Sequence, residues 1–558
     1  MPLFIGKIVL PRLQIDQPVL LLYQDKDGRA NWDFSNGADK GKPLILPLIQ
    51  NFIINNGQVK ANLLQNHLVF SGTVNAHEKA DASTSAFALT GQGNLNDKVF
   101  QLVATGGPLL NVKSSVPYPF VMQVRAGETH VTAKGRVLHP FNLGQLDATV
   151  TFSGRDLYDL YYLTGLAMPN TGPYTVSAQV NRNNRLYTID KIRGHIGSSD
   201  LGGKLKVDTS REHGRPDVTG DLYSRVLDFK DMGSLFGASN ANAPTAPSMS
   251  MTPMASTAAH RLLPDAPLDV ERVRGMDAKV HYRADSVRAS ANMPMRAVSL
   301  GMTLDHGLLT LDPIDFTFPY GHLTGTASLN ARSDVQQNAI DMRLVGIHVQ
   351  DFLAKGGNPP LEGSLDARVR ATGTGNSVHK AAANANGQLT VVMPGGTIRQ
   401  SLAELMGIDA TKGLFLLLSK DKHETDIRCA VADFGINNGV MQAQNVVFDT
   451  GVVLVNGSGT VNLNDERLNL TFKGKPKKFR LVRVDAPILI GGHMAAPKFG
   501  ISAGPAVAQG GLALVLHSII PFLGFDTAKD ANCAGLMATA QSLGAPMAGK
   551  TMAKQATK

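Results

Sequence analysis

The sequence predicts a mainly β protein: a long, strongly twisted antiparallel sheet that curves into a groove or packs as facing sheets, with a few short helices. Three observations support this prediction. Segments that alternate apolar and polar residues recur, as at 322–330, 365–372 and 468–473. Such a period of two places one set of side chains on each face of a sheet. Glycine, frequent at strand turns, makes up 56 of 558 residues, and stretches with helical periodicity are few.

Composition places the chain among folded proteins with an aliphatic core. Hydrophobic residues make up 43%, charged residues 18% and aromatic residues 6%, which is enough apolar surface to exclude a disordered chain. The net charge of +9 is mild for this length. The densest basic cluster, at 473–480, is interpreted as a solvated strand edge. Contact with anionic lipid headgroups is the next interpretation. No motif for nucleic-acid binding accompanies it, so no nucleic-acid partner is expected.

The apolar–polar strands are joined by turns rich in Asn, Asp and Gly. Three turns of one kind, each followed by a hairpin, are predicted at 55–57, 305–307 and 437–439. The hairpin units do not recur at a fixed period, which argues against a solenoid. Helices are expected at 158–166, 229–236, 399–419, 507–522 and 531–548.

Four regions follow from these patterns. Residues 1–237 form an N-terminal β-rich region, and 268–505 form a second one. Between them, 238–267 is rich in Pro, Ala, Met and Ser and reads as a flexible linker. Residues 506–558 form an α-helical tail. No segment is long and apolar enough to span a bilayer, and no signal peptide is recognised.

The sequence contains no convincing catalytic or metal-binding constellation. Residues 500–504 match a nucleophile elbow around Ser502, but no acidic residue separates Ser502 from the following His517. Residues 544–551 match a phosphate-binding loop without the preceding strand that such a loop needs. We therefore predict no enzyme activity, no cofactor and no metal. The two cysteines, Cys429 and Cys533, allow one disulfide or none, and their spacing leaves that open.

Several stretches resemble the AsmA family of bacterial envelope proteins. Residues 13–34 contain an apolar strand followed by a motif of the form dG-x-x-NW, carried by Asp27, Gly28, Asn31 and Trp32. Residues 194–207 are similar to a G-x-iG-x-S-dl-x-G segment, carried by Gly194, Gly197, Ser199, Asp200 and Leu201. Residues 268–330 and 487–499 are similar to the family's C-terminal repeat and closing segment. The order of these motifs makes the resemblance specific.

The resemblance implies a protein that binds or conducts phospholipids between the inner and outer membranes and supports outer-membrane assembly. It implies a location at the periplasmic face of the inner membrane, with phospholipids, membrane surfaces and envelope proteins as partners. Family members usually begin with a membrane-anchoring helix, whereas this chain begins almost at the strand before Trp32. The alternative is an envelope scaffold whose β faces pack shut and carry no lipid.

If a groove is present, its lining should come from the apolar positions of the alternating strands. The same positions could instead be closed core, and the sequence does not separate the two. The candidates are Leu323, Leu329, Leu365, Val369, Val461, Leu463, Leu468, Leu470 and Phe472.

Overall fold

The structure is a computed structural model of the 558-residue chain. It describes residues 9–31, 48–64, 67–79, 87–108, 117–139, 142–210, 215–231, 261–265, 270–289, 294–353, 359–399, 403, 423–477, 487–501 and 527–544. The chain divides into two compact units: unit 1 comprises 1–233 with 275–280, and unit 2 comprises 234–274 with 281–558. Of the predicted linker, only 261–265 falls within the described residues, in unit 2.

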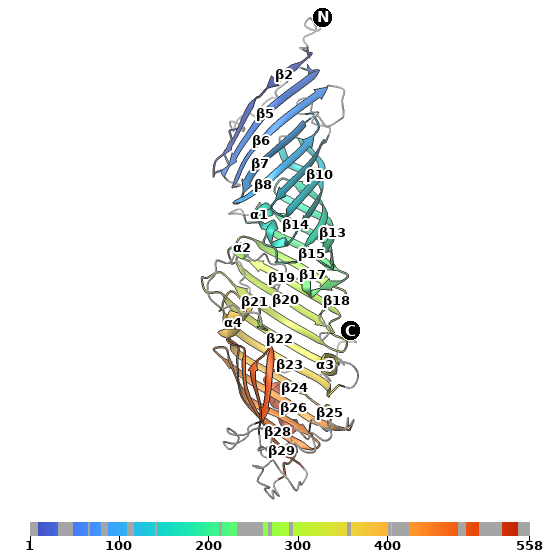
Figure 1. Ribbon diagram of the computed structural model, residues 1–558, viewed down its shortest axis with the longest axis vertical. Coiled ribbons are helices and arrows are strands. Elements are labelled where there is room, and N and C mark those ends of the chain that lie inside the picture. The colour runs from blue at the N-terminus through green and yellow to red at the C-terminus, as the bar shows by residue number, and fades with distance from the viewer. Residues whose placement is uncertain are drawn as a thin grey trace, which may run out of the picture. The chain divides into compact units, whose positions relative to one another are not determined.

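Unit 1 is almost entirely β (Figure 1). Its strands are β1 (Val9–Leu10), β2 (Leu13–Asp16), β3 (Val19–Gln24), β4 (Leu48–Ile49), β5 (Asn51–Leu63), β6 (Leu68–Lys79), β7 (Phe87–Leu95), β8 (Lys98–Gly106), β9 (Tyr118–Ala126), β10 (Thr129–His139), β11 (Asn142–Gly154), β12 (Tyr174–Asn183), β13 (Leu186–Ile196), β14 (Ser199–Asp208), β15 (Asp217–Ser224) and β16 (Leu227–Asp228). A 3₁₀ helix, η3 (Leu157–Leu160), and α1 (Tyr161–Thr164) lie between β11 and β12.

From β5 to β15, each strand of unit 1 pairs antiparallel with the next one in the chain. This meander confirms the predicted hairpin architecture. The N-terminal strands differ from the prediction, because β2 and β3 both pair parallel with β5. The sheet is therefore mixed, since an alternating pattern specifies the faces of a strand but not its direction.

The predicted hairpin turn at 55–57 is wrong, because these residues lie within β5. Asn56 has a φ of 50°, and the pairing register with β6 shifts between Ile54 and Gly57. At this irregularity β5 changes its parallel partner from β2 to β3. Asn and Gly tolerate positive φ, so an Asn-Asn-Gly sequence is compatible with a β-bulge as well as with a turn. The turns at 305–307 and 437–439 are confirmed, with His306 and Asn438 at φ of 48° and 44°.

Unit 2 repeats the same architecture, with more helices at its margins. Its elements are α2 (Val270–Arg274), β18 (Val287–Arg288), β19 (Ala297–Asp305), β20 (Leu308–Thr317), β21 (His322–Asn330), β22 (Gln337–His348), α3 (Gln350–Leu353), β23 (Leu361–Thr374), α4 (Val378–Ala383), β24 (Asn386–Met393), β25 (Gly396–Arg399), β26 (Glu424–Asn437), β27 (Val440–Thr450), β28 (Val453–Asn462), β29 (Arg467–Pro476), β30 (Ile488–His493), β31 (Ala496–Ile501) and α7 (Cys533–Ser542). The strand β17 (Asp277–Ala284) is divided between the two units.

The strands β19 to β24 form an antiparallel meander that Figure 1 shows side by side. The meander continues from β26 to β31, and β24 and β25 both pair with β26. The fold class predicted from the sequence, mainly β with few short helices, is confirmed.

The helix predicted at 158–166 corresponds to η3 and α1, and the one at 531–548 corresponds to α7. The helix predicted at 507–522 lies outside the described residues, as do most of those at 229–236 and 399–419.

Candidate functional site: one apolar face on each sheet

One face of the unit 2 sheet is apolar from strand to strand. The pairing register aligns one residue of each successive strand from β19 to β30, leaving out β25, into a row across the sheet. This row consists of Val298, Phe316, Leu323, Leu344, Ala367, Val391, Ala432, Val446, Gly457, Phe472 and Ile488. It holds no polar side chain, so the sheet carries a continuous apolar stripe.

A second row runs beside the first on the same face. It consists of Met302, Leu311, Ala327, Ile340, Ala371, Gly387, Ile436, Met441, Val461 and Leu468. The opposite face carries polar side chains beside this stripe. One of its rows consists of Thr324, Arg343, Arg368, Thr390 and Asp433. The sheet of unit 2 thus has one apolar face and one mainly polar face, as its period-two sequence requires.

All nine positions proposed from the sequence belong to this apolar face or directly follow it. Eight of them lie in β21, β23, β28 and β29, at positions that the alternation of the strand places on the apolar face. The ninth, Leu463, directly follows β28. Val461 is buried, with 6% of its surface exposed. The other eight are half-buried, and Ile340 in the second row is 38% exposed. Solvent therefore reaches much of the face.

Two parts of the unit 2 face are more closely packed. In one cluster the buried residues are Met393, Ile398, Ala403, Ile427, Val452, Val453 and Val455, with Leu365 and Phe472 packed against them. In the other they are Ala371, Ala385, Ile436, Met441 and Val461, with Leu463, Leu468 and Leu470 packed against them. Neither cluster includes Leu323, Leu329 or Val369. The apolar face is thus partly core and partly accessible surface.

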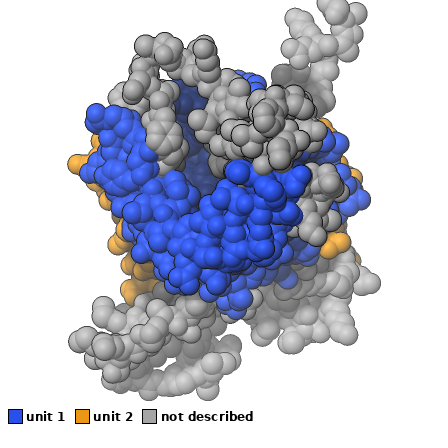
Figure 2. Space-filling view, turned by 90° about the horizontal axis from the view of Figure 1, so that it is seen from above, with its two compact units in different colours: residues 1–233, 275–280 blue, residues 234–274, 281–558 orange. Residues whose placement is uncertain are grey.

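Unit 1 carries the same division between its faces. A row from β5 to β14 consists of Val59, Gly72, Gly91, Leu102, Val124, Val131, Phe152, Val176, Gly194 and Leu201. The reverse face carries Gln123, Thr132, Thr151, Ser177 and Arg193 in one row. Figure 2, which looks onto unit 1, shows a hollow between its walls. The sequence candidates did not include this second apolar face, although its alternation is visible in β10 and β11.

Glycines within these strands let aromatic rings lie against the sheet. A Cβ atom at Gly72 would lie 2.7 Å from Cζ of Phe70, so the ring occupies the space that a side chain would fill. Phe70 and Phe100 stack with centroids 6.2 Å apart. In unit 2, a Cβ at Gly457 would lie 2.8 Å from Cε1 of Phe472. Rings that lie against the sheet add apolar area without projecting far above the face.

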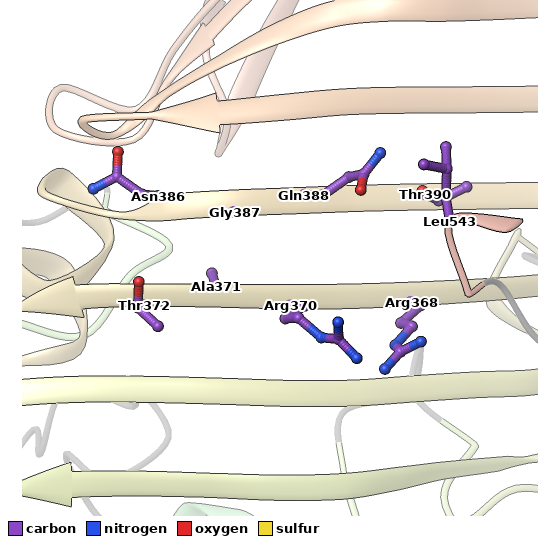
Figure 3. Close-up of a pocket in the computed structure, with 9 residues that line it drawn as sticks. All are labelled: Arg368, Arg370, Ala371, Thr372, Asn386, Gly387, Gln388, Thr390 and Leu543. Atoms are coloured by element: carbon purple, nitrogen blue, oxygen red, sulfur yellow. The ribbon is translucent and has the colours of Figure 1, made fainter.

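On the polar face of unit 2, a cavity of about 380 Å³ lies over β23 and β24 beside the end of α7 (Figure 3). It is lined by Arg368, Arg370, Ala371, Thr372, Asn386, Gly387, Gln388, Thr390 and Leu543. Both arginines are already engaged, because Asp341 on β22 accepts hydrogen bonds from Arg368 Nη2 at 2.7 Å and from Arg370 Nη2 at 3.1 Å. The hydrogen bonds from Arg368 lower the pKa of Asp341 to about 2. These side chains therefore form ion pairs that join β22 to the neighbouring strand β23.

The C-terminal segment is fastened to the same polar face. Cys429 on β26 and Cys533 on α7 form a disulfide, which answers the question that the sequence left open. The helix α7 packs on Val392 and Val431 through Leu536, Met537 and Ala540. The alternation of β24 and β26 places both valines on the polar face. Lys477 pairs with Asp449 and with Asp530, and the N–H of Ala531 donates to Asp449 Oδ2 at 2.9 Å. The helix α7 therefore covers part of the polar face of its sheet and not the apolar one.

In the dG-x-x-NW motif, Asn31 forms hydrogen bonds with the backbone of β3. The side chain of Asn31 donates to the carbonyl of Leu21 at 2.8 Å and accepts from the N–H of Tyr23 at 2.9 Å. These bonds occupy groups of β3 that would otherwise face solvent. Asp27 pairs with Arg29 at 2.9 Å, and Gly28 has a φ of 86° in the turn. Trp32 lies outside the described residues.

The second motif closes two turns. Gly197 turns between β13 and β14 with a φ of 55°, and the carboxylate of Asp231 accepts from the N–H and the hydroxyl of Ser199 at 2.8 and 2.7 Å. Asp200 accepts from the N–H of Val226 at 2.8 Å. Burial raises the pKa of Asp200, but the N–H groups of Val226 and Arg225 and the guanidinium of Arg225 outweigh it and leave the pKa lowered. Gly194 and Leu201 belong to the apolar row.

Of the two catalytic-looking strings, Ser502 and 545–551 lie outside the described residues. In the described part of the chain, no helix has the length and apolar character needed to cross a bilayer.

Comparison with known proteins agrees with the sequence motifs and the fold. The model of the AsmA family matches residues 47–446. The chain is also 26% identical over 550 residues to the AsmA family protein YhjG of Escherichia coli strain K12, covering 92% of this chain and 79% of that relative. The family match extends over most of the chain and includes strands of both units. With its meanders of one-sided strands and its two family motifs, the chain belongs to the AsmA family of envelope proteins.

Proposed function

We propose that this chain binds phospholipids by their acyl chains on its apolar sheet faces and conducts them between the inner and outer membranes, in support of outer-membrane assembly. The observation that carries the proposal is the unbroken apolar row from Val298 to Ile488, backed by a polar reverse face and accessible at many positions.

The chemistry of the rows suits transport better than tight binding. Burying a CH₂ group stabilises by ~0.8 kcal/mol, so half-covering an acyl chain of about 16 carbons contributes about 6 kcal/mol. That contribution is spread evenly, because neither described row contains a charged or hydrogen-bonding side chain. An acyl chain that shifts by one strand exchanges one set of aliphatic contacts for a similar set, so the barrier to sliding is low.

The proposed location is the periplasmic face of the inner membrane, with membrane surfaces and other envelope proteins as partners. Family membership supports this location. The disulfide between Cys429 and Cys533 is in keeping with it, because such bonds persist in oxidising compartments. The proposed function is not enzymatic. The charged pair Arg368–Asp341 joins β23 to β22, and Lys477, which follows β29, pairs with Asp449 on β27.

The second candidate function is an envelope scaffold without lipid. It is favoured by the two closely packed clusters on the unit 2 face, where Val453 is 1% and Ala403 0% exposed. The two candidates differ in what the accessible positions contact: lipid in the first case, and only solvent or a protein partner in the second.

The test is native mass spectrometry with lipid extraction on the chain purified in mild detergent. The chain is expected to carry several phospholipids. The double variant Leu323→Lys/Val369→Lys places two charges on the accessible part of the apolar face and should lose at least half of that lipid. Half-buried positions tolerate Lys better than closed core, because its ammonium group can reach solvent.

The matched control is Thr326→Lys/Thr372→Lys, which places the same charges on the polar faces of the same two strands, at exposed positions. It should keep the full amount of lipid, and circular dichroism should show the same strand content for all three proteins. A folded wild-type chain without lipid would overturn the proposal in favour of the scaffold. Equal lipid loss in test and control variants would also contradict it.

A further inference from the structure

The first strands of the unit 1 sheet expose apolar side chains on both of their faces. The register with β5 places Leu20 opposite Val59, in line with the apolar row of unit 1. It places Val19 and Leu21 on the reverse face, opposite polar residues of β5. All three side chains of β3 are more than half exposed, at 58%, 51% and 60% in chain order. We define the edge patch as the exposed apolar residues of β2 and β3, which are Ile15, Val19, Leu20, Leu21 and Tyr23.

This patch occupies an edge of the sheet. Among the described strands β3 pairs only with β5, and its six residues, Val19–Gln24, include no charged side chain. Natural sheets usually protect their edges with charged residues, proline or a bulge. An exposed apolar patch at an edge therefore indicates a surface that contacts something apolar.

The outward backbone groups of β3 already have partners. The side chain of Asn31 donates to the carbonyl of Leu21 at 2.8 Å and accepts from the N–H of Tyr23 at 2.9 Å. The N–H of Asn31 donates to the carbonyl of Tyr23 at 3.0 Å. A protein partner that adds a strand to a sheet binds through such backbone groups. Because Asn31 holds them, this edge offers a partner apolar side chains rather than hydrogen bonds.

We propose that the edge patch lies against the surface of a lipid bilayer, with its apolar side chains among the outer parts of the acyl chains. Acyl chains cannot form hydrogen bonds, so a strand edge that contacts them needs its backbone groups paired within the protein. The carbonyl of Leu21 and both backbone groups of Tyr23 meet that requirement. Tyr23 also lies next to the turn 25–29, where Arg29 pairs with Asp25 and Asp27. An aromatic ring between apolar and charged residues is typical of a membrane interface.

The edge patch is continuous with the apolar face of unit 1. Leu20 lies beside Val59, and Leu22 packs against the cluster that contains Ala61 and Phe70. A phospholipid could thus pass between the bilayer and the sheet without crossing a polar surface. This inference rests on the proposed function, because it names the place where the lipid path of unit 1 meets a membrane.

The test is sedimentation of the full-length protein with vesicles of phosphatidylethanolamine and phosphatidylglycerol. The wild type should bind, and binding should persist at high salt, because ions do not screen apolar contacts as they screen charges. The variant Val19→Glu/Leu21→Glu should bind at least tenfold more weakly. The control is Val99→Glu/Val103→Glu, which adds the same two charges at 67% and 46% exposed positions of β8, on the same face of the sheet. It should bind within twofold of the wild type.

A fluorescent label shows where the protein meets the vesicle. The native cysteines are paired with each other, so a thiol introduced by Leu21→Cys or Val99→Cys can be labelled alone with a dye that responds to polarity. Vesicles should shift the emission of the Leu21→Cys label to the blue and leave that of the Val99→Cys label unchanged. Circular dichroism should show wild-type strand content in every variant, because all substituted side chains are exposed.

The outcomes separate the docking edge from the proposed function. A wild type that carries phospholipid in native mass spectrometry but does not bind vesicles would overturn the docking edge alone. So would equal losses of vesicle binding in the edge variant and the control. Dimers that form without vesicles and are abolished by Val19→Glu/Leu21→Glu would show that a second copy covers the patch, which would also overturn it. A wild type that carries no phospholipid would instead overturn the proposed function.

Discussion

At the scale of single residues, polar side chains of this protein complete the edges and turns of its sheets. Asn31 satisfies both a carbonyl and an N–H of β3, and Asp231 and Asp200 each cap backbone N–H groups at successive turns. An exposed strand edge with free polar groups invites pairing with another chain. The described residues Asn31 and Asp200 of the family motifs therefore serve the chemistry of a sheet edge and a turn.

The substitution Asn31→Ala should expose the edge of β3. It removes two hydrogen bonds, at a cost of about 1–2 kcal/mol, and frees the N–H of Tyr23. We expect faster hydrogen exchange at Tyr23 and concentration-dependent association by light scattering. Asn31→Asp keeps the acceptor and loses the donor, so its effect should be intermediate. A monomeric Asn31→Ala protein with unchanged exchange would show that the edge is protected by other means.

The ion pairs of Asp341 should make stability depend on pH in the acid range. Its pKa is about 2 in the folded chain because of the hydrogen bonds from Arg368, against about 3.9 for an unfolded Asp. A lowered pKa gives stability that is present above the unfolded value and is lost as pH falls toward the folded one. Between about pH 4 and 2, the melting temperature of the wild type should therefore fall more steeply than that of Asp341→Asn. Parallel curves for the two proteins would refute this contribution.

At the scale of elements, the helix α7 is attached to the polar side of unit 2 by a covalent bond, ion pairs and a small apolar contact. The disulfide joins residues 104 positions apart. The pairs formed by Lys477 use Asp449, which is 0% exposed, and Asp530 on the segment before the helix. Because a single helix of this length has little stability of its own, its position depends on these attachments.

Removal of the disulfide should release α7 before the sheet unfolds. For Cys429→Ala/Cys533→Ala we expect a loss of about 2–4 kcal/mol, since the bond closes a long loop in the unfolded chain. Hydrogen exchange of 533–542 should accelerate more than that of β26 or β27. The single variant Ala540→Ser, at the contact with Val392 and Val431, tests packing alone and should cost less. An unchanged melting temperature in the double variant would contradict this assignment.

At the scale of the whole molecule, each sheet turns one apolar and one polar face to its surroundings, and few described helices cover the apolar ones. In a closed protein such strands would pair their apolar faces with a second layer. Here Ile340 is 38% exposed and Leu323 and Val369 are half-buried, while α7 packs on the reverse face. That arrangement is what a path for acyl chains requires.

A path made of successive positions in series is blocked by one obstacle. The single variant Ile340→Lys should therefore reduce phospholipid transfer between vesicles at least tenfold, while the amount of bound lipid falls by only a small fraction. Thr326→Lys on the polar face of β21 should change neither quantity. If transfer and binding fall in the same proportion, the lipids occupy independent sites and do not move along the sheet.

Much of this protein follows from its sequence alone. The period-two alternation established the mainly β fold and the two chemically distinct faces, because side chains of a strand alternate whatever their partners are. It also placed Leu323, Leu329 and Val369 on the apolar face, and the motif residues identified the family. Local helical periodicity predicted the helical segment that contains η3 and α1. It did not indicate that Leu163 packs against apolar residues of the unit 1 sheet.

The tertiary structure decided what depends on contacts between distant residues. The parallel pairing of β2 and β3 with β5, the bulge at Asn56 and the disulfide between Cys429 and Cys533 are of this kind. So is the choice between core and accessible surface, which separates Val461 from Leu323 although both alternate alike. Sequence pattern encodes which way a side chain points from its own strand, whereas burial depends on what the rest of the chain places above it.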